Sequence, residues 1–179
     1  MHNLRKNGSC MSQAIQVNDE NYKWMDTTYS TVIKRTDCND TDFQKLIRLL
    51  DADLKVRNGE ETQVFFQQFN IIRDIDTVVL AYCDGVAAGC GCFKQYDADS
   101  AEVKRMYVIS EKRGQGIAAL VLRELELWAK ELGYGRLVLE TGTRLPEAIS
   151  LYQKHGYERI ANWGQYIGIT ESVCMGKEL

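Results

Sequence analysis

The pattern of hydrophobic and polar positions changes around residues 113–118, where a strand pattern gives way to a helix pattern. Before this point, β-branched and aromatic residues dominate Ala101 to Ile109 and predict a strand. After it, apolar residues recur at steps of four and three and predict an amphipathic helix that ends at Gly133. The apolar face consists of Ile117, Val121, Leu125, Trp128 and Leu132. The pattern therefore predicts a strand, a glycine-rich turn and a helix in succession.

The first part of the chain predicts another strand and two helices. Ser30 to Arg35 is a short β-rich run, and the capping residues of Asp37 to Asp42 precede a helical pattern. The apolar positions of this helix are Phe43, Leu46, Ile47, Leu50 and Leu54. Asn58-Gly59 interrupts the pattern, and Glu60 to Phe69 predicts a second, shorter helix.

The middle and end of the chain alternate between strand and helix patterns. Thr77 to Cys83 and Val86 to Gln95 flank Asp84-Gly85 and form the strongest hairpin signal in the chain. Three consecutive antiparallel strands therefore lead into the glycine-rich turn. The later elements are a strand at Arg136 to Thr141, a helix at Pro146 to His155, and strands at Tyr157 to Ala161 and Ser172 to Lys177.

The organisation of the chain indicates one domain with an N-terminal extension. Residues 1–29 are polar with scattered aromatics and no clear period, which fits either a disordered extension or a segment that covers the core. Residues 30–179 contain no internal repeat, no low-complexity segment and a single proline. We therefore expect a single domain over residues 30–179.

Composition and charge exclude several functional classes. A net charge of −3 and a pI near 5.5 argue against a nucleic-acid-binding protein. No apolar run approaches the length needed to span a bilayer, and Met1 to Ser12 lacks the apolar segment of a signal peptide. The expectation is a cytoplasmic protein that binds neither nucleic acid nor membrane.

The cysteine and histidine content predicts no metal site. The six cysteines form no C-x-x-C pair, and only His2 and His155 could supply imidazole ligands. We interpret the cysteines as free thiols in a reducing compartment.

The turn at residues 113–118 has the chemistry of a phosphate site. The first N–H groups of a helix lack intrahelical partners, and the helix dipole is positive at this end. Gly114 and Gly116 let the backbone come close to a ligand, and Arg113 adds a forked positive charge suited to a pyrophosphate. Two rival phosphate motifs fail, because Lys94 replaces the third glycine after Gly89-Cys90-Gly91, and Gly176-Lys177 lacks the rest of a P-loop.

This turn resembles motif A of the GCN5-related N-acetyltransferase (GNAT) superfamily, Arg/Gln-x-x-Gly-x-Gly/Ala, through Arg113, Gly116 and Ala118. The order of predicted elements over residues 30–179 and the segment Ala148 to Tyr157 are also similar to that superfamily. The resemblance implies an α+β, three-layer acyl-CoA acyltransferase fold with a mixed central sheet of about seven strands and about four flanking helices. It also implies acetyl-CoA as the cofactor.

The resemblance assigns cofactor contacts to two segments. The strand ending in Met106, Tyr107 and Val108 would pair its backbone with the pantetheine arm, and an N–H near Met106 would polarise the thioester carbonyl. The turn would hold the pyrophosphate. Its residues are Arg113, Gly114, Gln115, Gly116, Ile117 and Ala118.

Three residues are candidates for proton transfer. Tyr152 matches the family tyrosine that protonates the departing sulfur, and its alternative role is that of a core aromatic. Glu102 matches a catalytic glutamate of the histone acetyltransferases, but it lies about 13 Å before Met106 along an extended strand, so a bridging water is expected. Glu140 is the competing base, and water alone is a further alternative.

Two aromatic segments are candidates for the acceptor site. Phe65, Phe66 and Phe69 fit either a pocket lining or core packing, and Trp163 to Gly168 fits either an acceptor rim or surface packing. One departure from the family concerns Leu145, which stands where many members carry an asparagine that can bind the cofactor.

We therefore hypothesise an acetyl-CoA-dependent N-acetyltransferase. The amine of a small molecule or peptide would attack the thioester directly in a ternary complex, because no Cys–His pair suggests a covalent intermediate. The alternative is a non-catalytic acyl-CoA-binding or regulatory module, and a third possibility is a structural interaction domain. The resemblance also implies a homodimer, whereas the sequence leaves the acceptor amine open.

Overall fold

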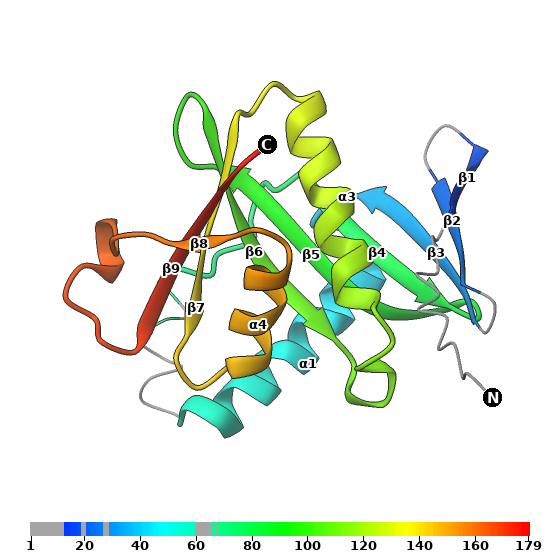
Figure 1. Ribbon diagram of the computed structural model, residues 1–179. Coiled ribbons are helices and arrows are strands. Elements are labelled where there is room, and N and C mark those ends of the chain that lie inside the picture. Colours follow the sequence, from blue (N-terminus) through cyan, green and yellow to red (C-terminus); the bar gives the residue numbers. More distant parts are fainter. Residues whose placement is uncertain (1–12, 19–20, 27–28, 60–65, 67) are drawn as a thin grey trace, which may run out of the picture.

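The protein folds into one mixed β-sheet with helices on both faces (Figure 1). The structure is a computed structural model that describes residues 13–18, 21–26, 29–59, 66 and 68–179. The strands are β1 (Gln13–Asn18), β2 (Asn21–Asp26), β3 (Tyr29–Thr36), β4 (Val78–Cys83), β5 (Val86–Gln95), β6 (Ser100–Val108), β7 (Arg136–Gly142), β8 (Glu158–Arg159) and β9 (Ser172–Glu178). The helices are α1 (Thr41–Asn58), α3 (Ile117–Glu131) and α4 (Pro146–Lys154), with 3-10 turns η1 (Ser110–Lys112) and η2 (Gly164–Tyr166).

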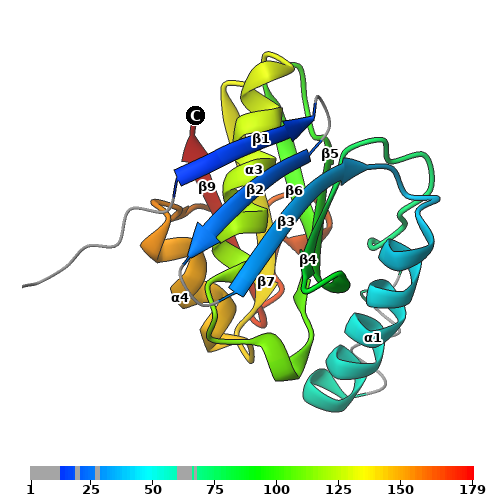
Figure 2. The ribbon, with the colours of Figure 1, turned by 90° about the vertical axis from the view of Figure 1, so that its right-hand side faces the viewer.

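The strand order in the sheet is β1-β2-β3-β4-β5-β6-β7-β9-β8. Within the described residues every neighbouring pair is antiparallel except β6 and β7, which are parallel and are connected through α3. Helix α1 lies on one face of the sheet, and α3 and α4 lie on the other (Figures 1 and 2). The result is three layers with a core on each side of the sheet.

Strand β4 shows why its sequence is a continuous apolar run. Val79 and Ala81 belong to the hydrophobic cluster beneath α3, whereas Val78 and Leu80 belong to the cluster beneath α1. Because successive side chains of a strand point to opposite faces, a strand covered on both faces needs an apolar residue at every position.

The predicted α+β fold with a mixed sheet is confirmed. The sequence predicted about seven strands in residues 30–179, and strands β3 to β9 are seven strands, of which β3 begins one residue earlier, at Tyr29. Strands β1 and β2 add two antiparallel strands from residues 13–26, beyond the range assigned to the domain. The predicted helix at Glu60 to Phe69 lies mostly outside the described residues. The division of the chain into an extension, residues 1–29, and a domain, residues 30–179, stays a prediction.

The predicted hairpin between β4 and β5 is present, with Asp84 and Gly85 at its turn. Both residues have positive φ, at 52° and 79°, which matches the twist of the flanking strands. The five cysteines in the described part of the chain are free and buried. No helix in that part is long and apolar enough to span a bilayer.

The glycines of β5 allow α3 to lie close against the sheet. A Cβ on Gly89 would lie 2.9 Å from Ile117 Cγ2, and a Cβ on Gly91 would lie 2.9 Å from Leu125 Cδ1. Both distances are shorter than ordinary carbon contacts. The Gly-x-Gly run at residues 89–91 therefore serves helix packing, which agrees with its rejection as a nucleotide motif.

Replacing Gly91 with Ala should lower the free energy of unfolding by about 2–3 kcal/mol, because the added methyl group overpacks the contact with α3. The added Cβ would overlap Met106 Sδ and lie 3.0 Å from Val121 Cγ1. Gly142→Ala is the matched control, since a Cβ there meets its nearest neighbour at 3.9 Å. Urea unfolding measures both variants, and equal stabilities would contradict this packing role.

Candidate active site between strands β6 and β7

Strands β6 and β7 separate after a short stretch of pairing, and this separation creates the site. They pair only from Ser100↔Arg136 to Val103↔Leu139. Beyond Val103, β6 continues to Val108, while β7 stays paired with β9 as far as Gly142. The edge of β6 that faced β7 therefore has no strand partner at residues 104–108, and two adjoining cavities border it.

A β-bulge in β6 accompanies this separation. Cys90 pairs with Tyr107 and Cys92 with Lys104, so Arg105 and Met106 together face the single residue Gly91. Arg105 has φ = 58°, an unfavourable value for a residue with a side chain. Its guanidinium donates hydrogen bonds to Asp51 Oδ1 at 2.7 Å and to the Asn70 carbonyl at 2.6 Å. These bonds hold the bulge against α1 and the segment before β4.

The larger cavity, of about 550 Å³, is enclosed by β6, the 112–119 turn, α1 and α4. It brings together most of the residues that the sequence assigned to the cofactor. These are Met106, Tyr107, Val108, Arg113, Gly114, Gly116, Ile117 and Ala118. Gln115 is absent from the lining, and its side-chain amide donates to the Glu111 carbonyl instead.

The N-terminus of α3 opens on the larger cavity. Gly116 occupies the N-cap position in a left-handed conformation, with φ = 79°, and no side chain caps the helix. A Cβ on Gly114 or Gly116 would meet no protein atom within 4 Å. The glycines therefore leave open space in front of N–H groups that have no intrahelical partner, as an anion site requires.

Arg113 is fixed at the wall of the same cavity. Its Nε donates to the Val108 carbonyl at 2.9 Å, its Nη2 pairs with Asp53 Oδ2 at 2.9 Å, and its guanidinium lies 5.5 Å from the centre of the Tyr107 ring. Asp53 also lies 3.5 Å from Arg57, which in turn pairs with Glu147 of α4. This chain of charges links the 113–118 turn to α1 and α4.

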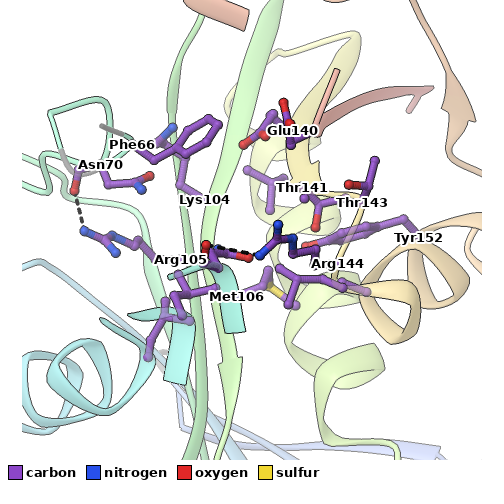
Figure 3. Close-up of a pocket in the computed structure, with 18 residues that line it drawn as sticks. Phe66, Asn70, Lys104, Arg105, Met106, Glu140, Thr141, Thr143, Arg144 and Tyr152 are labelled. Atoms are coloured by element: carbon purple, nitrogen blue, oxygen red, sulfur yellow. Dashed lines mark hydrogen bonds between the residues drawn. The ribbon is translucent and has the colours of Figure 1, made fainter. Parts of the chain in front are cut away.

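The smaller cavity, of about 180 Å³, lies where β6 and β7 separate (Figure 3). Residues from α1, β6, β7, the β7–α4 loop and α4 enclose it. Leu50, Leu54, Met106, Leu145, Ala148 and Tyr152 line both cavities. The two cavities therefore meet at the bulge of β6 and at one face of α4.

Tyr152 lies where the cavities meet. Its side chain is buried and its ring contacts Tyr157 edge to face, yet its hydroxyl has no hydrogen-bond partner among the described residues. Burial, and secondly the charge of Glu140, raise the pKa of Tyr152 above its ordinary value. The phenol therefore keeps its proton at neutral pH, with its hydroxyl free to donate it.

Glu140 lines the smaller cavity from β7 and accepts a hydrogen bond from Ser172 Oγ at 2.7 Å. Burial raises the pKa of Glu140, whereas the Ser172 hydrogen bond and the charge of Lys104 lower it part of the way. A carboxylate with a raised pKa beside a cavity is suited to accept a proton.

Glu102 lies apart from both cavities. It is buried, accepts a hydrogen bond from Lys104 Nζ at 2.8 Å and lies 3.6 Å from Lys94 Nζ. It is absent from the lining of the smaller cavity, to which Lys104 belongs. Its assignment as a base stays a prediction, and the geometry favours Glu140.

The aromatic segments divide between the cavity and the core. Phe66 lines the smaller cavity and stacks on Tyr166 at 6.4 Å, Phe69 packs against Tyr166 at 6.2 Å, and Phe65 lies outside the described residues. Tyr166 is buried, and Trp163 packs against it. The segment around η2 therefore packs under the 66–69 segment and contributes no lining residue to either cavity.

Sequence reasoning missed the contribution of α1 and of the β7–α4 loop. Asp53 and Arg57 line the larger cavity, although their spacing of four on a helix reads as an ordinary surface ion pair. Arg144 lines the smaller cavity and carried no motif. Leu145 precedes α4 without a side-chain cap, so the substitution seen in the sequence leaves this helix end without a polar side chain.

Comparison with known proteins identifies the family to which this architecture belongs. The model of the Acetyltransferase (GNAT) family matches residues 43–157, which is more than half of the chain. IAA acetyltransferase of Azospirillum brasilense is 33% identical over 102 residues, 56% of this chain and 67% of that protein. The uncharacterized N-acetyltransferase YsnE of Bacillus subtilis is 34% identical over 94 residues, 51% of this chain. That match spans 62% of YsnE, less than two thirds of its length.

Solved structures share the fold over most of the chain. A protein from Klebsiella pneumoniae described as an acyl-CoA N-acyltransferase superposes with a TM-score of 0.67 and 28% identity, covering 86% of this chain and 99% of that one. PaiA N-acetyltransferase from Thermoplasma acidophilum, solved in complex with coenzyme A, superposes with a TM-score of 0.64 and 21% identity, covering 84% of this chain and 99% of that one.

Proposed function

The chain belongs to the GNAT family of acetyltransferases, and from this premise we propose that it transfers the acetyl group of acetyl-CoA directly to a primary amine. The observation that carries the proposal is the uncapped N-terminus of α3, which opens on a cavity of about 550 Å³ that meets a second cavity at Tyr152. A cytoplasmic location and a homodimer stay predictions.

The residues of the larger cavity fit the cofactor. The N–H groups after Gly116 and the guanidinium of Arg113 would hold the pyrophosphate, because both present donors and positive charge to one open space. The unpaired edge of β6 at Met106, Tyr107 and Val108 would hold the pantetheine arm, since a strand edge offers backbone donors and acceptors. Acetyl-CoA supplies the activated acetyl thioester when bound there.

The chain's own residues would transfer protons on both sides of the reacting thioester, the acceptor side and the sulfur side. Glu140, on the acceptor side, accepts a proton from the amine and so frees its lone pair. A backbone N–H at the bulge near Met106 donates to the developing oxyanion, and the Tyr152 hydroxyl gives its proton to the departing sulfur. An ammonium group loses two protons on becoming an amide. Glu140 takes the first and releases it to solvent, and the second leaves the nitrogen after the attack and restores Tyr152, which has given its own proton to the sulfur.

Incubation of the purified protein with acetyl-CoA and a panel of primary amines tests the proposal. Thiol release together with mass-spectrometric detection of the acetylated amine is the expected result. Binding of acetyl-CoA without acetylation of any amine would favour a regulatory module, and no binding at all would exclude both functions.

Gly116→Ala should weaken acetyl-CoA binding about tenfold, the equivalent of about 1.4 kcal/mol, because the methyl group would occupy the space in front of the α3 N-terminus. Gly133→Ala is the matched control: Gly133 lies just after the other end of α3, has φ = 90° and likewise has no protein atom near its Cβ position. Both variants carry a similar backbone strain of about 1 kcal/mol. Equal losses of affinity in calorimetric titrations would contradict the site.

Tyr152→Phe should lower kcat about 100-fold and leave acetyl-CoA affinity unchanged, because it removes the proton donor and keeps the ring. Tyr157→Phe is the control, since Tyr157 packs against Tyr152 but lines neither cavity. Steady-state kinetics and binding measure the pair. A Tyr152→Phe enzyme with the wild-type kcat would show that another group protonates the sulfur.

Glu140→Gln should lower kcat about 100-fold and remove the acidic limb of the pH profile. The wild-type enzyme should lose activity as pH falls through the Glu140 pKa, which burial places above the ordinary value, because only the carboxylate accepts a proton. Since folding raises the pKa of Glu140, its buried charge destabilises the fold at pH values above that pKa. Glu140→Gln removes this charge and should therefore remain as stable as the wild type at neutral pH. Glu102→Gln with a larger effect on the same limb would instead assign the base to Glu102.

A further inference from the structure

Among the described residues that line the smaller cavity, Arg144 is the one cation that forms no ion pair with a carboxylate. Arg144 follows Glu140 by four positions in the β7–α4 loop, and Figure 3 shows its guanidinium reaching into the cavity. Among the described residues it forms no ion pair, and its hydrogen bonds go from Nη1 to the carbonyls of Asn58 at 3.3 Å and Arg57 at 3.5 Å. Its Nε and Nη2 donors make no such contact.

The other two cations of this cavity differ from Arg144. Lys104 is buried against Glu102 at 2.8 Å, and Arg105 is buried against Asp51 at 2.7 Å. Their charges are matched within the protein, so an anionic ligand would have to compete with a carboxylate already in place. In the described part of the cavity lining, Arg144 is therefore the cation available to a ligand.

The position of Arg144 is set by the backbone of its loop. Thr143 N donates to the Glu171 carbonyl at 2.8 Å, and Leu145 N donates to the Gly142 carbonyl at 3.0 Å, which closes a tight turn around Arg144. Arg144 lines the smaller cavity and not the larger one. Its charge therefore faces the acceptor side and not the cofactor side.

The described lining of the acceptor side has two carboxylates, Glu140 and Glu171, and one cation without an ion pair, Arg144, with apolar walls from Leu50, Leu54 and Phe66. We propose that the acceptor is a free amino acid with an apolar side chain, bound through its α-carboxylate by Arg144 while its amine faces Glu140. This inference rests on the proposed function and deepens it. A forked guanidinium suits a carboxylate, because both can form two parallel hydrogen bonds.

Acetylation of matched acceptors tests the assignment. The probes are L-leucine and L-phenylalanine, each paired with its α-amide and assayed with acetyl-CoA. The proteins are the wild type, Arg144→Gln, Arg144→Lys and the control Arg159→Gln. Arg159 is a surface arginine of β8 that lines neither cavity. The wild type and the control should prefer each acid to its amide in kcat/KM. Arg144→Gln should raise KM for the acids about 10- to 100-fold and bring the acid-to-amide ratio in kcat/KM to one or below, with partial recovery in Arg144→Lys.

The amides make the comparison demanding, because their amines lose a proton more easily and chemistry alone favours them. Amides acetylated as fast as the acids, or an acid-to-amide ratio that Arg144→Gln leaves unchanged, would overturn the carboxylate assignment while leaving the acetyltransferase intact. Binding of acetyl-CoA with no turnover of either member of any pair would overturn the amino-acid acceptor. Absence of acetyl-CoA binding would overturn the proposed function itself.

Discussion

The end of pairing between β6 and β7 at Val103 is the constraint on which the rest of the site depends. Beyond it, β6 is free on one edge, and both cavities border this part of β6, the smaller one between β6 and β7 and the larger one between β6, the 112–119 turn, α1 and α4. The bulge at Arg105 lies in this same stretch of β6, with a positive φ that two hydrogen bonds, to Asp51 and Asn70, hold in place. Strain of this kind persists only where the surroundings determine it, so α1 and the segment before β4 are part of the site although they carry no motif.

Charge is distributed differently in the two cavities. The described lining of the larger cavity has four cations, Arg57, Lys112, Arg113 and Lys154, and two carboxylates, Asp53 and Glu147, which pair with Arg113 and Arg57. The excess of positive charge and the uncapped end of α3 together suit a ligand with several negative charges. In the smaller cavity, Lys104 and Arg105 are paired with Glu102 and Asp51, and the remaining charged residues of its described lining are Glu140, Glu171 and Arg144. Burial raises the pKa of both Tyr152 and Glu140, which keeps a proton on the first and favours its capture by the second. Both proton-transfer groups thus line the smaller cavity.

The sequence predicted the local part of this account well. The step from strand to helix at residues 109–117 was readable because strand period, glycines and helix period change within a few positions, and the structure places Arg113, Gly114 and Gly116 in one cavity wall. The hairpin at Asp84-Gly85 was readable for a similar reason, since its turn residues accept positive φ. Features that depend on contacts between distant segments were not readable. The bulge at Arg105 has no local signature, and Arg144 becomes notable only when the structure shows which cations already have partners.

In the proposed complex, the end of α3 and Arg113 hold the pyrophosphate of acetyl-CoA while the β6 edge holds the thioester arm. Calorimetric titration of the intact protein with acetyl-CoA and with S-acetyl-pantetheine, which has the same thioester arm and no pyrophosphate, tests this most directly. We expect one acetyl-CoA site per chain and a much weaker affinity for S-acetyl-pantetheine, and the difference between the two affinities should shrink as salt screens the charges. Equal affinity for the two compounds, or no binding of acetyl-CoA by the folded protein, would contradict it.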